Sequence, residues 1–231
     1  MLADALTRAF GLLAALDPDV LDAARVSLTV STASTLLALA LGLPVGALVG
    51  LARFPGRRAV VATVHALMAL PTVVVGLVVY ALLSRSGPLG GAGLLYTRAA
   101  MVVGQAVLAL PIVAGLAIGA LEQVDARLRP TAWSLGAGRL ATAWLVLREA
   151  RFALLAAGAA AFGRVFSEVG VSMMLGGNLR GETRNLATGI ALETGKGEFA
   201  LGLALGLVLL AAALLVNGAL AWLRAAERGP R

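Results

Sequence analysis

The sequence predicts an all-α integral membrane protein, and three observations support this fold class. The chain has 231 residues, of which 60% are hydrophobic and only 13% charged, whereas soluble domains average roughly half apolar and about a quarter charged residues. The charged residues divide the chain into long uncharged segments that exceed the ~20 residues a helix needs to cross a bilayer. Because these segments follow one another closely, residues 1–231 are expected to form a single transmembrane domain.

The first stretch of the chain differs from the segments that follow. Its large apolar residues recur at helical spacing, at Leu2, Leu6, Phe10 and Leu13. An aspartate and an arginine lie off that face, so we expect an amphipathic helix at the membrane interface or against the bundle. The same two charges interrupt the apolar run that a cleavable signal peptide requires, and we expect the chain to stay whole.

Five segments are predicted to cross the membrane as helices, because a helix satisfies its own backbone in lipid. They span about 26–52, 59–83, 99–121, 152–176 and 200–223. The motif Ala-Leu-Pro occurs inside two of them, at Pro71 and Pro111, and a proline within a helix favours a kink. Gly42, Gly46 and Gly50 form a small face on the first span, which allows a second helix to approach closely.

The loop at residues 122–151 is too long for a turn and too polar for a span. Its apolar residues fall at roughly helical intervals, and Pro130 suits a first helical turn, so we expect short helices lying across the membrane face. Loops on this side of the membrane carry more basic and fewer acidic residues than the other loops. The positive-inside rule therefore places this loop and the C-terminus in the cytoplasm, with the N-terminus outside.

The outer stretch at 177–199 is rich in glycine and polar residues. Gly177 is expected to end the fourth span, and Asn185 to cap a short helix at 186–192. Arg180 and Arg184 would then lie at the outer mouth. Arginine binds oxyanions well through its planar fork of donors, although arginines near lipid headgroups are equally ordinary features of a loop.

Arg164 and Glu168 place two charges inside the fourth span. An arginine there costs about 2.5–3.5 kcal/mol on insertion scales, and such charges usually face the bundle interior or an aqueous path. A spacing of four residues puts both side chains on one helix face, where they can neutralise each other. One interpretation is a buried ion pair that fixes helix packing, and the other is contact between Arg164 and a passing anion.

Several functional classes are disfavoured by what the sequence lacks. There is no cysteine and only one histidine, His65, so we expect no metal site and no cofactor. Ser167 has no nearby histidine or lysine that could activate it as a nucleophile, and a phosphate-binding GxxxxGK[ST] loop is missing. The formal net charge of +7 is explained by basic loops rather than by nucleic-acid binding. The chain is therefore not expected to be an enzyme, and any ATP energy must come from another subunit.

A set of motifs in the second half of the chain resembles a known family. The motifs are Phe162-Gly163-Arg164, Ser167-Glu168-Val169-Gly170, Gly176-Gly177-Asn178, Arg180-Gly181 and Ile190-Ala191-Leu192-Glu193-Thr194. Together they look like the permease subunits of type I ATP-binding-cassette (ABC) importers that carry tungstate and molybdate, and more like the tungstate permeases. The resemblance covers roughly residues 20–223 and implies the type I importer permease fold.

The loop at 122–151 is similar to the cytoplasmic motif of this family. That motif reads Glu-Ala-Ala, three residues, Gly, nine residues, Ile, one residue, Leu-Pro. Here Ala132 and Gly136 match its second alanine and its glycine, Val146 stands at its isoleucine, and Pro130 and Thr131 replace Glu-Ala. The resemblance implies that these five residues belong to coupling helices that dock onto an ATPase.

The resemblance also implies an assembly in the cell (inner) membrane. Two permeases would form a homodimer with the translocation path between them, two separate ATPase subunits would bind the coupling helices, and an extracytoplasmic binding protein would deliver the oxyanion. The residues expected to line or gate the path are Arg164, Ser167, Glu168, Gly177, Asn178 and Arg180. The motifs leave open tungstate, molybdate or another oxyanion such as sulfate.

Two other classes of protein compete with this interpretation. A secondary transporter or channel would explain the spans and the internal charges, but it would not explain the long helical loop at 122–151, and five spans offer no obvious paired repeat. A membrane scaffold without transport would tolerate substitution of Arg164 and Glu168.

Overall fold

All regular secondary structure in the part of the chain described here is helical, which confirms the all-α prediction. The structure is a computed structural model that describes residues 2–227. Its elements are α1 (Leu2–Ala14), α2 (Pro18–Leu51), α3 (Arg57–Met68), α4 (Thr72–Leu83), a 3₁₀ turn (Gly90–Ala92), α5 (Arg98–Glu122), α6 (Leu128–Ser134), α7 (Arg139–Glu149), α8 (Arg151–Phe166), α9 (Gly170–Gly176), α10 (Leu186–Lys196) and α11 (Phe199–Glu227).

Three helices are long and apolar enough to cross a membrane on their own: α2, α5 and α11. The predicted spans at 59–83 and 152–176 are not single helices. The first is divided into α3 and α4 with a bend of 94°, and the second into α8 and α9 with a bend of 62°. The described residues thus hold three spans, or up to five if each bent pair counts as one.

The two Ala-Leu-Pro motifs behave differently. Pro71 stands at the break between α3 and α4, where its carbonyl oxygen accepts the amide hydrogens of Val74 and Val75. Pro111 lies inside α5, which continues through it as one helix, so this proline does not divide its span. Proline inside a membrane helix is tolerated where neighbouring helices and local adjustments satisfy the freed backbone groups, and α5 has α2, α3, α8 and α9 against it.

The first span begins earlier than predicted, at Pro18 rather than near residue 26. The Asp17 carboxylate accepts the amide hydrogens of Asp19 and Val20, and Pro18 stands in the first turn, where its missing N–H costs nothing. The charges that marked the expected boundary lie on the first turns of the helix. A boundary drawn at the last charge therefore misses a capped polar end.

The pairing of α2 with α5 forms the centre of the bundle, and the glycine face on α2 makes it possible. A Cβ atom at Gly46 would lie 2.7 Å from Ala117 Cβ and 2.8 Å from the carbonyl oxygen of Ala114. At Gly42 it would lie 3.0 Å from Val113. The close approach that the glycine spacing predicted is confirmed.

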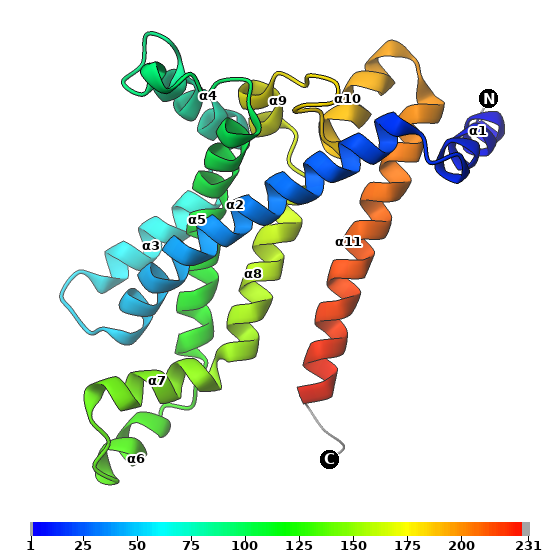
Figure 1. The fold of residues 1–231 in the computed structure, drawn as a ribbon. Helices are drawn as coiled ribbons and strands as arrows, with labels where there is room; N and C mark the ends of the chain where they lie inside the picture. Colours follow the sequence, from blue (N-terminus) through cyan, green and yellow to red (C-terminus); the bar gives the residue numbers. More distant parts are fainter. Residues whose placement is uncertain (1, 228–231) are drawn as a thin grey trace.

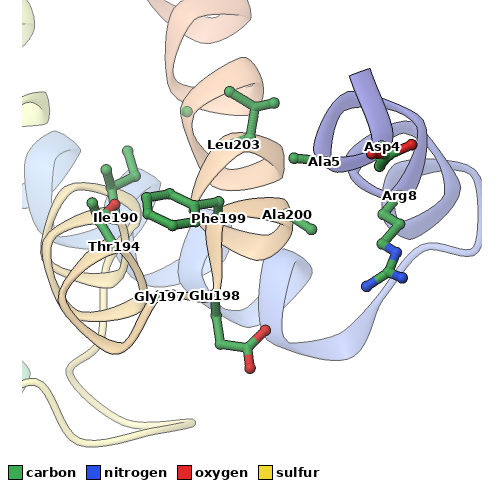
Figure 2. A pocket seen from close by; sticks show the side chains of 12 residues that line it. Asp4, Ala5, Arg8, Ile190, Thr194, Gly197, Glu198, Phe199, Ala200 and Leu203 are labelled. Atoms are coloured by element: carbon green, nitrogen blue, oxygen red, sulfur yellow. The ribbon is translucent and has the colours of Figure 1, made fainter. Parts of the chain in front are cut away.

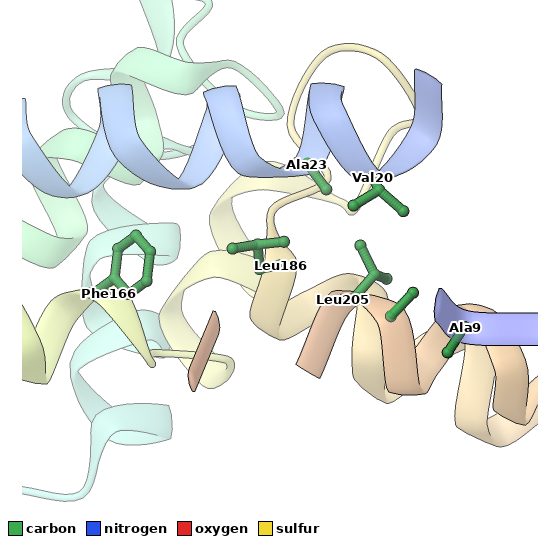
Figure 3. Packing of buried hydrophobic residues seen from close by; sticks show 7 residues of the cluster. Ala9, Val20, Ala23, Phe166, Leu186 and Leu205 are labelled. Atoms are coloured by element: carbon green, nitrogen blue, oxygen red, sulfur yellow. The ribbon is translucent and has the colours of Figure 1, made fainter. Parts of the chain in front are cut away.

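The elements gather at two ends of the molecule (Figure 1). One, the α10 end, holds α1, the start of α2, α9 and α10, while the other, the α7 end, holds α6, α7 and the late part of α11. A buried cluster fixes the α10 end: Ala9, Val20, Ala23, Phe166, Leu186, Ala204 and Leu205 (Figure 3). Through this cluster α1, α2, α8, α10 and α11 share one core.

The face that α1 packs against α11 is rotated from the predicted face. Ala9 is fully buried, with Leu12 and Leu13 packed beside it, whereas Phe10 is 59% exposed. A small residue at the contact lets α1 approach α11 closely, and the larger Phe10 ring points away from the bundle. The helix is present, and its inward face is the one that carries Ala9.

Candidate functional site

Arg164 and Glu168 form the ion pair that their spacing predicts. Arg164 Nη1 donates to Glu168 Oε2 across 2.7 Å. The Glu168 side chain is only 3% exposed, whereas that of Arg164 is 42% exposed. Glu168 Oε1 also accepts the amide hydrogen of Val171 at 3.3 Å, so the carboxylate bridges the break between α8 and α9. The pair therefore presents an accessible guanidinium on a buried carboxylate anchor.

The two broken spans meet at their breaks. A Cβ atom at Gly170, the first residue of α9, would lie 3.2 Å from Thr72 Oγ1 and 3.3 Å from Val73 Cγ2 at the start of α4. The second half-helices of both broken spans thus begin beside each other, next to Glu168. Ser167 lies in the α8–α9 break, and its hydroxyl donates back to the carbonyl oxygen of Gly163.

A groove of ≈ 390 Å³ runs between α3, α5 and α8. Most of its wall consists of small residues: Gly115, Gly119 and Ala120 on α5, and Ala153, Ala156, Ala157 and Ala160 on α8. The larger side chains that complete it are His65 and Met68 of α3, Leu116 of α5, and Gln123 directly after α5. Ala160 lies one helical turn before Arg164, so the same face of α8 leads from the groove to the exposed guanidinium.

A buried polar chain that was not predicted from the sequence crosses the bundle beside this site. Gln105 of α5 is fully buried; its Oε1 accepts from Ser34 Oγ at 3.1 Å and its Nε2 donates to Ser172 Oγ at 2.9 Å. The chain joins α2, α5 and α9. A lone amide in the middle of an apolar span was the signal that could have predicted it, since such a group must find partners in lipid.

The arginines expected at the outer mouth are engaged by carboxylates. Arg180 makes a two-pronged contact with Asp19, in which Nε and Nη2 lie 2.6 Å from the two carboxylate oxygens. The neighbouring carboxylate raises the pKa of the Arg180 guanidinium. Arg184 is mostly buried and lies 3.5 Å from Glu193, which also accepts from Lys196. The structure thus places neither side chain as a free anion-binding fork.

Gly177 and Asn178 form the turn that ends α9. Both adopt the left-handed backbone conformation, with φ of 69° and 54°, which suits glycine and asparagine at a helix end. A Cβ atom at Gly177 would lie 2.7 Å from the Tyr96 ring. Asn178 Nδ2 donates to the carbonyl oxygen of Thr188 at 3.4 Å. Both residues therefore belong to the turn that joins α9 to the segment before α10. The predicted short helix that follows is confirmed as α10, and Asn185 caps it.

The predicted coupling residues divide into a hidden and an accessible set. Ala132 and Val146 are buried, and Gly136 has φ of 81° in the turn between α6 and α7. Pro130 and Thr131 are both exposed. Around them lie exposed apolar side chains: Trp133, Leu135, Leu140, Trp144 and Leu145. Leu135 is 82% and Leu140 89% exposed, so this helix pair presents an uncovered apolar surface at the α7 end (Figure 1).

Comparison with known proteins identifies a matching family and several relatives. The family described as "Binding-protein-dependent transport system inner membrane component" matches residues 42–229. A protein of Haloferax volcanii named as a probable anion ABC transporter permease is 45% identical, over 83% of this chain and 85% of that protein. Tungstate uptake system permease proteins TupB of Campylobacter jejuni and Peptoclostridium acidaminophilum are 41% and 37% identical, over 93% and 94% of this chain and 90% and 95% of those proteins.

Proposed function

Since the chain belongs to the family of binding-protein-dependent transport system inner membrane components, we propose that it is the membrane permease of a tungstate importer. The substrate assignment rests on the similarity to two tungstate uptake permeases, which extends over nine-tenths or more of the chain. A family of this kind also disfavours a secondary transporter or channel. The permease itself catalyses no reaction, and the energy comes from a separate ATPase subunit.

The proposed path uses the face of α8 that carries Arg164. A tungstate ion is a divalent oxyanion, and an accessible guanidinium donates hydrogen bonds to such a group in a fixed fork. The buried Glu168 holds Arg164 in place and balances its charge, so the exposed N–H groups of the guanidinium can donate to an anion without a net positive charge that would trap it. The groove beyond Ala160 offers small side chains and little bulk, which suits the passage of a compact ion.

The other expected path residues have supporting roles in this proposal. Ser167 and Glu168 shape the break between α8 and α9, while Gly177 and Asn178 turn the chain towards α10. Arg180 secures the outer loop to the start of α2 through Asp19. In the homodimer the groove faces the second copy, and the path runs between the two Arg164 side chains.

The exposed surface of α6 and α7 is proposed to dock onto the ATPase. Large apolar side chains that are 56% to 89% exposed, such as Trp133 and Leu140, are suited to fill pockets on a partner. The motif residues Ala132, Gly136 and Val146 hold the two helices in the correct geometry, with Pro130 and Thr131 in the first helix. Two ATPase subunits then serve two permeases, and an extracytoplasmic binding protein delivers the anion at the α10 end.

Molybdate is the second candidate substrate. The molybdenum permease ModB of Escherichia coli is 29% identical over 75% of this chain, and tungstate and molybdate share charge and shape. Cellular tungsten and molybdenum content, measured by mass spectrometry, tests both. Cells with and without this gene are grown in trace tungstate or in trace molybdate.

We expect loss of tungsten uptake in the deletion strain and its return on complementation. Equal loss of both metals would make the protein a general oxyanion permease. Unchanged content of both metals, with the protein present in the control strain, would refute the substrate assignment.

A further inference from the structure

A second cavity, of ≈ 670 Å³, lies between α1, α10 and the start of α11 (Figure 2). None of the residues that line this cavity also lines the groove that leads to Arg164. Its volume falls in the range of about 300–1,000 Å³ that is typical of small-molecule sites. Nothing in the proposed transport path uses it.

The inner part of this cavity is apolar and opens along α11. Ala200, Leu203 and Gly206 line it on that helix, and a Cβ atom at Gly206 would meet nothing within 4 Å. Leu210 and Leu214 continue the same helical face by one and two turns, and they are 56% and 63% exposed. An exposed apolar track on a membrane-spanning helix is a surface for an acyl chain.

The mouth of the cavity is charged. Arg8 and Glu198 line it, which gives one positive and one negative group. The side chains of Arg8 and Glu198 point towards the same edge of Figure 2, away from Leu203. Among the described residues neither Arg8 nor Glu198 forms an ion pair, unlike Arg180 and Arg184 at the same end of the molecule. The cavity thus offers a guanidinium and a carboxylate to a ligand, next to its apolar part.

We propose that this cavity binds one membrane phospholipid with an ethanolamine headgroup. The lipid phosphate accepts hydrogen bonds from Arg8, the primary ammonium donates to Glu198, and an acyl chain follows Leu203, Gly206 and Leu210. Phosphatidylglycerol fits less well because it has no ammonium group and adds a net negative charge beside the Glu198 carboxylate. Phosphatidylcholine carries a cation that has no N–H donor. The bound lipid fills the space between α1 and α11 and holds α1 against the bundle.

Native mass spectrometry of the purified full chain tests this proposal. The detergent-solubilised protein is titrated with palmitoyl-oleoyl phosphatidylethanolamine, phosphatidylcholine and phosphatidylglycerol. We expect one ethanolamine lipid per chain, retained about tenfold more strongly than the glycerol lipid, the equivalent of one charge-assisted hydrogen bond. Gly206→Leu should remove the adduct, whereas Ala211→Leu, which places the same leucine side chain on an exposed position of α11, should not.

The headgroup assignment has its own variants. Arg8→Gln should weaken the binding of all three phospholipids, because each carries a phosphate. Glu198→Gln should abolish the preference for the ethanolamine lipid over the glycerol lipid. Arg25→Gln, at a position that is 79% exposed and outside the cavity, should change neither. If Gly206→Leu prevents folding, the site is tested instead by the lipid preference of the folded Glu198→Gln variant.

Three results would overturn the proposal. Equal or stronger retention of phosphatidylglycerol by the unaltered protein would refute the ethanolamine headgroup, and retention unaffected by both Gly206→Leu and Glu198→Gln would refute the site. The chain has no native cysteine, so Leu203→Cys can report on a protein occupant. A disulfide between two copies through that cysteine would show that a second permease covers the cavity. These tests do not depend on import activity, so their failure leaves the transport proposal untouched.

Discussion

Arg164 combines two roles at the scale of single residues, and the roles make different demands. Its bond to Glu168 neutralises a carboxylate that is 3% exposed, and its exposed edge is available to an anion. Loss of one partner is more costly than loss of both, because an isolated buried acceptor keeps its desolvation cost. Stability and transport should therefore respond differently to single and double substitution.

We expect Arg164→Gln to lower the free energy of unfolding by about 1–3 kcal/mol, the usual cost of an unsatisfied buried acceptor, and to reduce tungsten uptake. The double variant Arg164→Gln/Glu168→Gln should recover most of the stability, since it replaces the carboxylate with a neutral amide, but not the uptake. Thermal unfolding of the purified protein and cellular tungsten content measure the two effects. Arg164→Lys, which keeps the positive charge, serves as the control. Full uptake by the double variant would show that Arg164 acts only in packing.

The residue scale also shows where inference from sequence stops. The four-residue spacing of Arg164 and Glu168 predicted their contact, because helix geometry is local. The partner of Arg180 could not be predicted in this way: Asp19 lies 161 positions away in the chain, and only the packing of α2 against the outer loop brings the two together. Local periodicity determines neighbours on one helix, whereas ion pairs between distant segments depend on the whole arrangement.

At the scale of elements, the same distinction separates α2 and α5 from the broken spans. The glycine face of α2 and the capped α10 helix followed from spacing and residue type. The bends of 94° and 62° did not, since uncharged length alone cannot distinguish a straight helix from two half-helices. Pro71 marked one break, but Pro111 has the same local motif and leaves α5 intact, so tertiary contacts decide the outcome.

The helix pair α6–α7 carries a prediction at this scale. Leu140 is 89% exposed and Val146 is buried, so the two apolar residues should fail in different ways. Leu140→Ser should reduce co-purification of the ATPase subunit while leaving the melting temperature of the permease nearly unchanged, because surface substitutions usually stay within about 0.5 kcal/mol. Val146→Ala should lower the melting temperature first, because it removes buried methyl groups.

Affinity purification of the permease with its co-expressed ATPase, followed by thermal unfolding of the permease alone, measures both effects. Thr63→Ala, on the exposed face of α3, controls for substitution elsewhere. Undiminished ATPase recovery with Leu140→Ser combined with Leu135→Ser would place the docking surface elsewhere.

At the scale of the whole molecule, the two ends have different characters that match their proposed surroundings. The α7 end combines the exposed apolar surface of α6 and α7 with an arginine-rich loop, as expected of a face turned to the cytoplasm. At the α10 end, Arg180 and Arg184 are tied to carboxylates within the chain. The early part of α1 and the late part of α11 lie at opposite ends (Figure 1), which an odd number of crossings requires.

The orientation in the membrane can be tested with two matched substitutions, because the chain contains no cysteine. Ser86, between α4 and α5, and Ser134, at the end of α6, are both exposed and lie towards opposite ends. We expect a membrane-impermeant maleimide to label Ser86→Cys in intact cells and Ser134→Cys only after the membrane is opened. The physical reason is the arginine excess beside Ser134, which resists translocation during insertion. The reverse labelling pattern would invert the topology and place the proposed ATPase-docking surface on the wrong side of the membrane, whereas labelling of both sites in intact cells would contradict a fixed transmembrane arrangement between them.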